Sequence, residues 1–442
     1  MIEPINPANP VRKWLLPVAL VILCCVPFLR SYEMRDRALK EDEVYWIGQA
    51  YYFHLAIEER DLSNPDWQLL PARENPVLGK YVIGQGLRVN GLSVTNVDWL
   101  GVFFIVAKDR PNAWGDAKDR QERQAVLDRM DPATRELALG PGQFKQPPEY
   151  ATTARLIMLV FGIVSILAVF ALARLYTNAV VAFLAALIFS LHPAVVAAYT
   201  EVGVDILATA FSLLAMISFA LIERNLWRQS GHPRPWRALI CVGGGLSLAF
   251  AVGSKLNAAA VGFAGAILTL WFAASYLGRR NRDAGESCIV MIGLLAISLA
   301  VFVGSSPANY PNPAKGIWAL YADNQRGLEI QKSIPALHHP LRSWGEHQAA
   351  VANLTAFHPA IFGLIVVAFL FYMVQARKAG KAFPLIPVWW LVAIVCVTAW
   401  IPFARPRYVL PVVAPSVILV CCAGGQIYQT VRSRVATRGT TS

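Results

Sequence analysis

The chain has 442 residues, of which 56% are hydrophobic and 15% are charged, and its formal net charge is +12. Soluble proteins carry about a quarter charged residues, so this composition excludes an ordinary soluble protein. The positive charges stand mostly in short segments between long apolar runs, a pattern that signals membrane topology and argues against a nucleic-acid partner.

Ten apolar segments are long enough to cross a bilayer, because a membrane-spanning helix needs roughly 20 mostly apolar residues. One such segment at the N-terminus could be a signal peptide, whereas a whole series cannot. The sequence therefore predicts an all-α integral membrane protein that forms a single domain over residues 1–442. The predicted spans are about 14–30, 154–173, 179–198, 202–222, 238–254, 258–277, 287–304, 357–375, 384–401 and 409–428.

Two long and mostly polar stretches, residues 31–153 and 305–356, interrupt the series of spans. Most of the short basic segments fall on one side of the membrane, although the charges around the first span point the other way. The positive-inside rule makes the basic side cytoplasmic. The two long stretches then become extracytoplasmic loops, which we expect to carry short interfacial helices, and in a bacterium the protein would lie in the inner membrane. The basic segments contain Arg224, Arg228, Arg234, Arg237, Arg279, Arg280, Arg282, Arg377, Lys378, Lys381, Arg432, Arg434 and Arg438.

The densest acidic cluster, Glu41-Asp42-Glu43, opens the first of these loops. One interpretation is structural. Acids are favoured in the first turn of a helix, and apolar residues follow at spacings of three and four, so residues 43–58 would form a helix on the outer membrane surface. Its aromatic residues would then lie in the interfacial belt; they are Tyr45, Trp46, Tyr51 and Tyr52.

The other interpretation of the acidic cluster is catalytic. A carboxylate held at the bilayer surface can reach both a water-borne acceptor and a lipid-borne donor. As a general base, Asp42 would deprotonate an attacking hydroxyl. Residue spacing alone leaves both interpretations open.

Further motifs follow in chain order at positions that are predicted to face outward. They are ENPVLGKYVIG at 74–84, ARL at 154–156, Glu201 with Asp205, GSK at 253–255, NYPNP at 309–313 and RPRYVLP at 405–411. Together with Asp42-Glu43, the series resembles the GT-C membrane glycosyltransferases, particularly the protein O-mannosyltransferase and aminoarabinose transferase branches, over most of residues 14–428. Three features depart from that pattern. Asn75-Pro76 stands where the family has His-Pro, and the first long loop is longer than usual from about residue 90 to 150. The second long loop is too short for the large soluble module of many protein mannosyltransferases, which weakens the case for a protein acceptor.

The resemblance implies an inverting glycosyltransferase that takes its sugar from a polyprenyl-phosphate-linked donor. The acceptor would be a hydroxyl of a protein Ser or Thr, a glycolipid or an envelope glycan. Asp42 is the expected general base and Glu43 its orienter. The residues expected to bind the donor phosphate are Lys255, Arg405, Arg407 and Tyr408. The further residues expected in the donor or acceptor pocket are Lys80, Arg155, Glu201 and Asp205.

Physical arguments support these assignments and also supply alternatives to them. Lys255 stands at the outer end of a span, where an unpaired charge is costly, but it could instead extend to the interface. Arginine matches phosphate through its planar fork, although Arg407 could lie in a solvated loop. Lys80 could be a surface charge. Glu201 and Asp205, four residues apart, would share one helical face and could hold a sugar hydroxyl, a cation or an arginine.

The sequence assigns no cofactor. A divalent cation at the acidic residues remains an alternative. The seven cysteines lie in apolar segments and show no spacing typical of a metal site. The rival function is a transporter or flippase of lipid-linked cargo, which would also need many spans and a few buried charges. The enzyme is favoured because the acids and cations gather at one predicted face of the membrane.

Overall fold

A computed structural model gives the fold and describes residues 10–34, 37, 40–73, 75–96, 121, 125, 128, 147–226, 233–310, 312–332, 341, 343–356, 359–378, 385–400 and 404–439. Within these ranges the chain is helical and contains no strand, as the sequence predicts. The central part of the first long loop, residues 97–146, lies largely outside the described residues.

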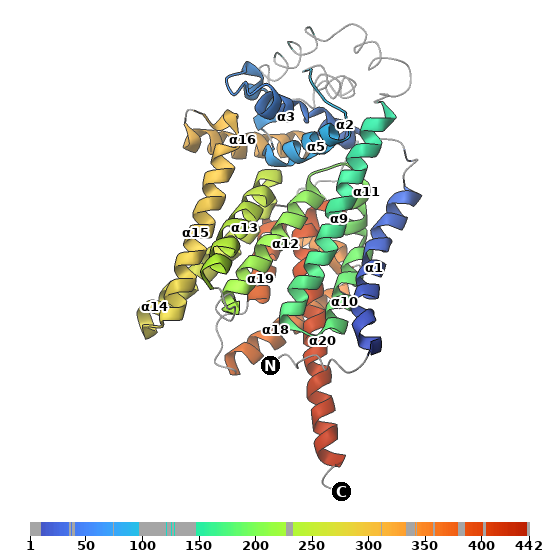
Figure 1. The fold of residues 1–442 in the computed structure, drawn as a ribbon, viewed down its shortest axis with the longest axis vertical. Helices are drawn as coiled ribbons and strands as arrows, with labels where there is room; N and C mark the ends of the chain where they lie inside the picture. Colours follow the sequence, from blue (N-terminus) through green and yellow to red (C-terminus); the bar gives the residue numbers. More distant parts are fainter. Residues whose placement is uncertain are drawn as a thin grey trace.

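Long helices run roughly side by side and form a bundle (Figure 1). The helices of the bundle are α1 (Pro10–Glu33), α9 (Pro148–Tyr176), α10 (Ala179–Leu191), α11 (Pro193–Thr200), α12 (Asp205–Glu223), α13 (Pro233–Ser254), α14 (Ala259–Arg279), α15 (Arg282–Gly304), α17 (Trp344–Ala356), α18 (Pro359–Lys378), α19 (Leu385–Trp400) and α20 (Leu410–Gly439).

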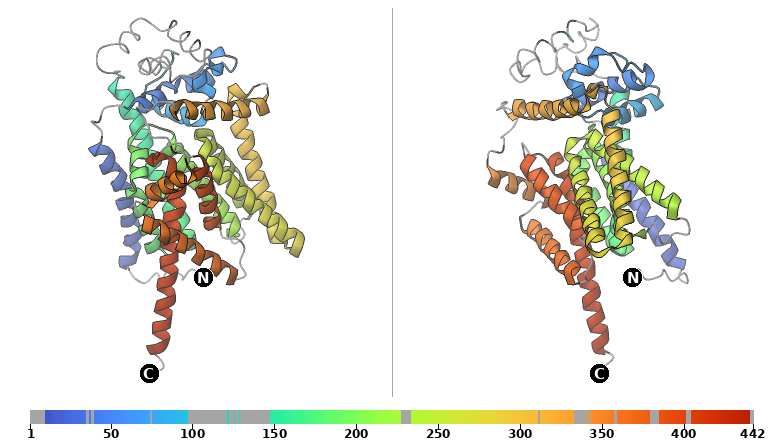
Figure 2. Two further views of the ribbon diagram at one scale, coloured as in Figure 1. Left: turned by 180° about the vertical axis from the view of Figure 1, so that it is seen from behind. Right: turned by 90° about the vertical axis from the view of Figure 1, so that its left-hand side faces the viewer.

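Shorter elements from both long loops cover one end of the bundle. In all views α2 and α5 from the first loop and α16 from the second lie together at this end, whereas the C-terminal part of α20 extends from the other (Figures 1 and 2). We call the covered end the loop end. Its elements are α2 (Glu41–Gly48), α3 (Tyr51–Phe53), the π-helical turn η1 (His54–Glu58), the 3-10 turn η2 (Pro65–Gln68), α4 (Leu70–Arg73), α5 (Leu78–Val89), the 3-10 turns η5 (Leu256–Ala258), η6 (Pro307–Asn309) and η7 (Pro406–Val409), and α16 (Pro313–Lys332).

Six helices among the described residues are long and apolar enough to span a membrane, and eight do so if each of two bent pairs counts as one span. Helices α1 and α19 lie at the first and ninth predicted spans, but the count of ten stays a prediction. The third predicted span, 179–198, is broken. Proline has no backbone N–H and clashes with the preceding turn, so α10 ends at Leu191 and α11 begins at Pro193 with a bend of 64°.

The acidic cluster does open a helix, but the single surface helix expected over residues 43–58 is wrong. Helix α2 ends at Gly48, and the chain continues as α3 and then η1. The aromatic side chains are buried in the protein core instead of lying in an interfacial belt: Tyr52 is 0% exposed and Trp46 is 9% exposed. Packing against α5 and the bundle therefore outweighs the interfacial preference that the sequence pattern favours.

Helix α5 fixes the loop-end elements to the bundle through close glycine contacts. A Cβ atom on Gly79 would lie 2.6 Å from Val204 Cγ1, and one on Gly253 would lie 2.4 Å from Leu78 Cδ1. Both positions therefore require glycine for this approach. The contacts hold α5 against the start of α12 and the end of α13, which are the two helix ends that carry Asp205 and precede Lys255.

Candidate active site

Glu43 is the most completely bonded acid at the loop end. Its side chain is 1% exposed and accepts hydrogen bonds from Arg155 Nε and Nη2, both at 3.0 Å. It also accepts from the backbone N–H of Val202 at 3.0 Å and from that of Lys40 at 3.0 Å. A bidentate arginine pair is among the strongest charge-assisted contacts. We call this group, Glu43 with Arg155 and Val202, the Glu43 clasp.

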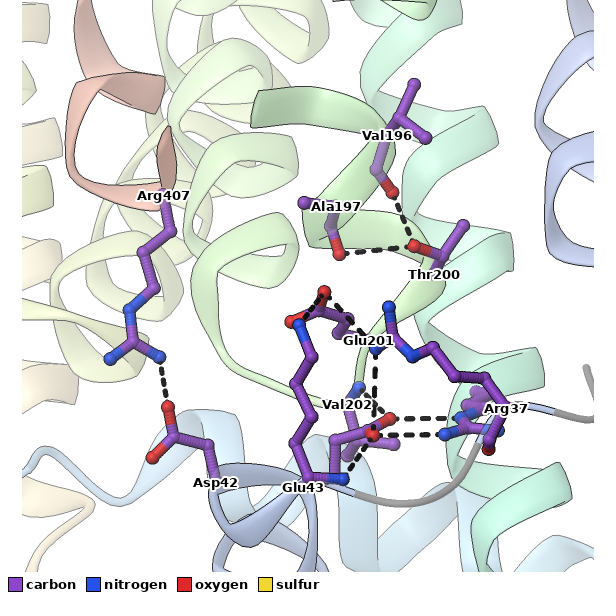
Figure 3. Close-up of polar contacts among 11 residues, drawn as sticks. Arg37, Asp42, Glu43, Val196, Ala197, Thr200, Glu201, Val202 and Arg407 are labelled. Atoms are coloured by element: carbon purple, nitrogen blue, oxygen red, sulfur yellow. Dashed lines mark hydrogen bonds and ion pairs between the residues drawn. The ribbon is translucent and has the colours of Figure 1, made fainter. Parts of the chain in front are cut away.

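The Glu43 clasp joins three separate segments, since Glu43 belongs to α2, Arg155 to α9 and Val202 to the turn between α11 and α12 (Figure 3). Burial disfavours the charged carboxylate, but the hydrogen bonds from Arg155 and the two backbone N–H groups outweigh it and hold the pKa of Glu43 below its ordinary value. The ionised clasp therefore sets the position of α2, and with it the position of the preceding residue, Asp42.

Asp42 points away from the clasp and meets a cation from the far end of the chain. Its Oδ2 accepts a hydrogen bond from Arg407 Nη1 at 2.5 Å (Figure 3). The Asp42 side chain is 49% exposed. Burial raises its pKa, but the positive charges of Arg407, Arg405 and Lys255 outweigh that effect and lower it below the ordinary value. The structure thus brings together residues that are more than 360 positions apart in sequence.

A second acid–cation pair lies beside the first. Lys255 Nζ donates to Asp205 Oδ1, and both side chains are mostly buried. Both cations lie near the Tyr408 ring, whose centroid is 5.4 Å from Lys255 Nζ and 5.5 Å from Arg407 Cζ. Each cation can gain from the negative face of the ring. The sequence-predicted cations Lys255 and Arg407 are therefore both close to Tyr408, and each is paired with a carboxylate.

A small pocket lies next to the Asp205–Lys255 pair. Its walls come from α12, η5, α14, α19 and α20, and it is mainly apolar with a few polar side chains. We call it the α12–α20 pocket. The residues that line it are Asp205, Ala208, Thr209, Ser212, Leu213, Lys255, Asn257, Ala258, Val261, Trp389, Leu410, Pro411 and Ala414.

Two sequence-based expectations about the remaining acids need correction. Glu201 and Asp205 do not share a helical face, because α11 ends at Thr200 and α12 begins at Asp205, with Glu201 in an extended conformation between them. Glu201 lies 2.5 Å from Lys40 Nζ and 3.2 Å from Arg37 Nη2, and Arg155 is instead engaged by Glu43. Glu201 therefore belongs to the clasp side of the site and Asp205 to the pocket side.

Lys80 is neither a surface charge nor a member of the group around Tyr408. It is 0% exposed, and its ammonium donates to the backbone carbonyls of Pro71 and Asn75 and lies 5.2 Å from the centroid of the Tyr52 ring. These contacts secure the turn that precedes α5. The expectation of a pocket role for Lys80 is thus replaced by a structural one.

Three site residues were not singled out from the sequence. Arg37 and Lys40 stand just before the acidic cluster, and their positive charge was a usable signal for a partner to Glu201. Trp389 has no such signal, because a tryptophan in an apolar span is typical of a packed core. Among the described residues, no group of three or more His, Cys, Asp or Glu side chains could hold a metal ion, so the divalent cation considered above has no assigned ligands.

Comparisons with known proteins agree with the helical architecture. A family model described as dolichyl-phosphate-mannose-protein mannosyltransferase matches residues 149–303. The oligosaccharyltransferase AglB from Archaeoglobus fulgidus, in complex with an inhibitory peptide and a dolichol-phosphate, aligns over 98% of this chain and 52% of its own, with 14% identity and a TM-score of 0.53. The apo form of the oligosaccharyltransferase from the same organism aligns over 98% of this chain and 52% of its own, with 12% identity and a TM-score of 0.54. No curated protein sequence matches the chain.

ArnT from Cupriavidus metallidurans in the apo state is also similar, with 14% identity and a TM-score of 0.50 over 94% of this chain and 60% of that one. The chain thus spans between half and three-fifths of the length of these solved structures. At such low identities the likeness establishes the fold, and it confirms the fold expected from the sequence motifs.

Proposed function

We propose that this chain, which belongs by its fold to the GT-C superfamily, is an inverting glycosyltransferase that moves a sugar from a polyprenyl-phosphate-linked donor to a hydroxyl acceptor. The observation that carries the proposal is the pairing of Asp42 with Arg407, with Lys255 close to the same Tyr408 ring as Arg407. Asp42 can accept a proton, Arg407 and Lys255 can neutralise a phosphate, and all three lie at one end of the bundle.

The reaction follows from these roles. The acceptor oxygen attacks the anomeric carbon while Asp42 removes the hydroxyl proton. The bond between the anomeric carbon and the phosphate oxygen breaks, and the polyprenyl phosphate leaves with that electron pair. Arg407, Lys255 and Arg405 stabilise the negative charge that develops on the phosphate. Attack from the face opposite the leaving group inverts the anomeric configuration.

The choice of donor is supported by the comparisons. The matching family is described by a dolichyl-phosphate-mannose donor, and AglB was solved with a dolichol-phosphate. The proposal specifies the acceptor only as a hydroxyl group, which can belong to a protein Ser or Thr, a glycolipid or an envelope glycan. The basic turn at Arg279 and Arg280 and the end of α20 lie away from the loop end (Figure 1), so by the positive-inside rule the loop end faces the extracytoplasmic side.

The rival function, a transporter of lipid-linked cargo, fits the charge distribution less well. Transporters place their binding groups near the membrane midplane. Here Asp205 is the first residue of α12 and Arg407 precedes α20, so both stand at helix ends. Purified protein in vesicles, given polyprenyl-phosphate mannose and a panel of acceptors, tests the choice: the enzyme releases polyprenyl phosphate, whereas a transporter moves the lipid without cleaving it.

Replacing Lys255 by alanine should weaken binding of sugar-free polyprenyl phosphate by about 10- to 100-fold, because a hydrogen bond to a charged group contributes roughly 1.5–3 kcal/mol. Lys255→Arg keeps the charge and should retain most of the affinity. Lys315→Ala, which removes an exposed lysine of α16, serves as the matched control. Affinity that is unchanged in Lys255→Ala, measured by titration in detergent, would remove Lys255 from the phosphate site.

The pH profile of transfer should show two different acid limits. Transfer is lost as pH falls through the pKa of Asp42, which the nearby cations hold below the ordinary value of an aspartate in the donor-free protein, so kcat/KM should not decline down to about pH 5. When the donor phosphate engages Arg407, the charge that lowers the pKa of Asp42 is largely neutralised. The acid limb of kcat should therefore lie at higher pH than that of kcat/KM. Coincident limbs would contradict this coupling.

A further inference from the structure

Gly203 lies in the turn between the clasp side and the pocket side of the site. It follows Val202, whose backbone N–H belongs to the Glu43 clasp. Two residues after it comes Asp205, which pairs with Lys255. Gly203 is partly exposed. Its φ is not positive, so a left-handed conformation does not explain why glycine occupies this position.

Close packing among the described residues does not explain this glycine either. The nearest atoms that an added Cβ would meet, apart from its chain neighbours, are Asp205 Oδ2 at 3.7 Å and Trp46 Cδ1 and Nε1, both at 3.9 Å. These are ordinary van der Waals distances, whereas a Cβ on Gly79 would lie only 2.6 Å from Val204 Cγ1. The fold therefore leaves room beside Gly203 that the sequence does not fill. We call this space, which Trp46 and Asp205 border, the Gly203 notch.

The Gly203 notch adjoins both groups that act in the proposed reaction. On one side, Asp205 accepts from Lys255 with Oδ1 and turns Oδ2 toward the notch. On the other side, Trp46 lies four residues after Asp42 in α2 and therefore on the same helical face. The anomeric carbon must lie between the base and the cations that hold the phosphate, so the sugar ring must lie beside these same residues.

The two walls of the notch suit a sugar better than they suit the other parts of the lipid donor. Asp205 Oδ2 can accept a hydrogen bond from a hydroxyl, and the indole edge of Trp46 that faces the notch combines apolar surface with an N–H donor. A prenyl chain would leave both polar groups unpaired. A phosphate placed against Asp205 Oδ2 would be repelled by the carboxylate.

We propose that the sugar of the lipid-linked donor lies in the Gly203 notch, where a hydroxyl donates to Asp205 Oδ2 and the ring contacts the indole edge of Trp46. The inference rests on the proposed glycosyltransferase function and adds the place of the sugar. Glycine admits the ring because any side chain at this position would occupy the space. Gly203 and Trp46 are thus specificity-determining residues beside the cations that hold the phosphate.

The variant Gly203→Ala fills the notch with one methyl group. It should weaken binding of dolichyl-phosphate mannose by about 10- to 100-fold, the effect of one overpacked methyl group, and leave binding of sugar-free dolichyl phosphate unchanged. The thermal midpoint of the donor-free protein should stay or rise, because the methyl group has room and alanine restricts the unfolded chain more than glycine does. Titration of each lipid into detergent-solubilised protein measures the two affinities.

The matched control is Gly304→Ala. Gly304 ends α15 at the loop end, and a Cβ there would meet no other part of the described protein within 4 Å, so both affinities should equal those of the wild type. Polyprenyl-phosphate glucose and polyprenyl-phosphate arabinose extend the comparison to other sugars.

A second variant, Trp46→Phe, keeps an aromatic ring and removes the indole N–H. Its thermal midpoint should fall, since Trp46 packs in the core, so the ratio of the two lipid affinities is the measured quantity. Binding of dolichyl-phosphate mannose should weaken by about three- to tenfold relative to dolichyl phosphate, the effect of one hydrogen bond. An unchanged ratio would remove Trp46 from the sugar contact.

The remaining outcomes separate this inference from the function on which it rests. Equal weakening of both lipids by Gly203→Ala would indicate that the notch holds the phosphate, and no weakening with any of the three sugars would show that the notch does not hold the donor sugar. Either result overturns the inference, as does a lower thermal midpoint in Gly203→Ala, which would show that the fold itself requires this glycine. If the wild-type protein binds no polyprenyl phosphate, with or without sugar, the proposed function itself fails.

Discussion

Asp42→Asn should reduce sugar transfer by about 10²–10⁴-fold, the usual contribution of a positioned general base, while the affinity for polyprenyl phosphate rises. Asparagine has nearly the same shape but cannot accept the proton. It also carries no charge to hold Arg407, which in the wild type donates to Asp42 at 2.5 Å. A phosphate that binds the wild-type protein must compete with Asp42 for this guanidinium, and the substitution removes that competitor together with its repulsion of the anion.

The measurement combines a transfer assay with a titration of sugar-free polyprenyl phosphate into each variant. Asp61→Asn is the matched control, because the hydrogen bonds seen for the Asp61 side chain are local, to Ser63 and Asn64 in its own turn, and it should change neither quantity. Transfer at the wild-type rate in Asp42→Asn would remove Asp42 from the chemistry. Loss of transfer with weaker lipid binding would indicate that Asp42 supports the site structurally and does not compete for Arg407.

The pairing of each cation with a carboxylate explains how such charges persist at the end of a membrane bundle. Asp42 with Arg407 and Asp205 with Lys255 make two neutral pairs, and unpaired charges at this depth would be costly. A donor phosphate can replace a carboxylate at either cation without leaving it unpaired. The donor-free protein is thus stable and the phosphate site is already assembled, which reduces the reorganisation needed when the donor binds.

The sequence predicts the bundle and the identity of most site residues, because apolar composition determines which segments can lie in a membrane. Asp42, Lys255 and Arg407 are singled out by the motifs that resemble the GT-C glycosyltransferases together with their positions at the predicted outer ends of spans, and their roles stay a proposal. Their pairing is not predicted, since several acids and cations reach the same end and spacing does not distinguish among the combinations. The placement of Glu201 against Arg37 and Lys40 is one such combination.

Other contacts are not predicted from the sequence because they involve backbone groups. Glu43 is held partly by the N–H of Val202, and Lys80 by the carbonyls of Pro71 and Asn75. Such donors and acceptors exist at every residue, so only the fold shows which are free to bond. The break between Glu201 and Asp205 had a usable signal in Gly203, because glycine inside a helical pattern lowers helix stability.

Arg155→Ala should destabilise the fold by about 3–5 kcal/mol, because it leaves the carboxylate of Glu43 buried without its cation. The side chain of Glu43 is 1% exposed, so water cannot replace the two hydrogen bonds that Arg155 donates. The backbone N–H groups of Lys40 and Val202 remain as partners, and Arg37 lies 3.9 Å from the carboxylate; these contacts favour the lower part of the range. The loss of stability is measured as the fall in the thermal midpoint of unfolding in mild detergent, relative to the wild type.

A double-mutant cycle distinguishes a clasp from two independent contributions. Glu43→Gln in the Arg155→Ala background removes the unpaired charge, so the double variant should be more stable than Arg155→Ala alone, with a coupling energy within about 0.5–3 kcal/mol. Strict additivity of the two substitutions would contradict the clasp. If the clasp positions α2, Arg155→Ala should also lower kcat more than it weakens the binding of polyprenyl phosphate, because Asp42 loses its fixed position while Lys255 and Arg407, on other helices, keep theirs.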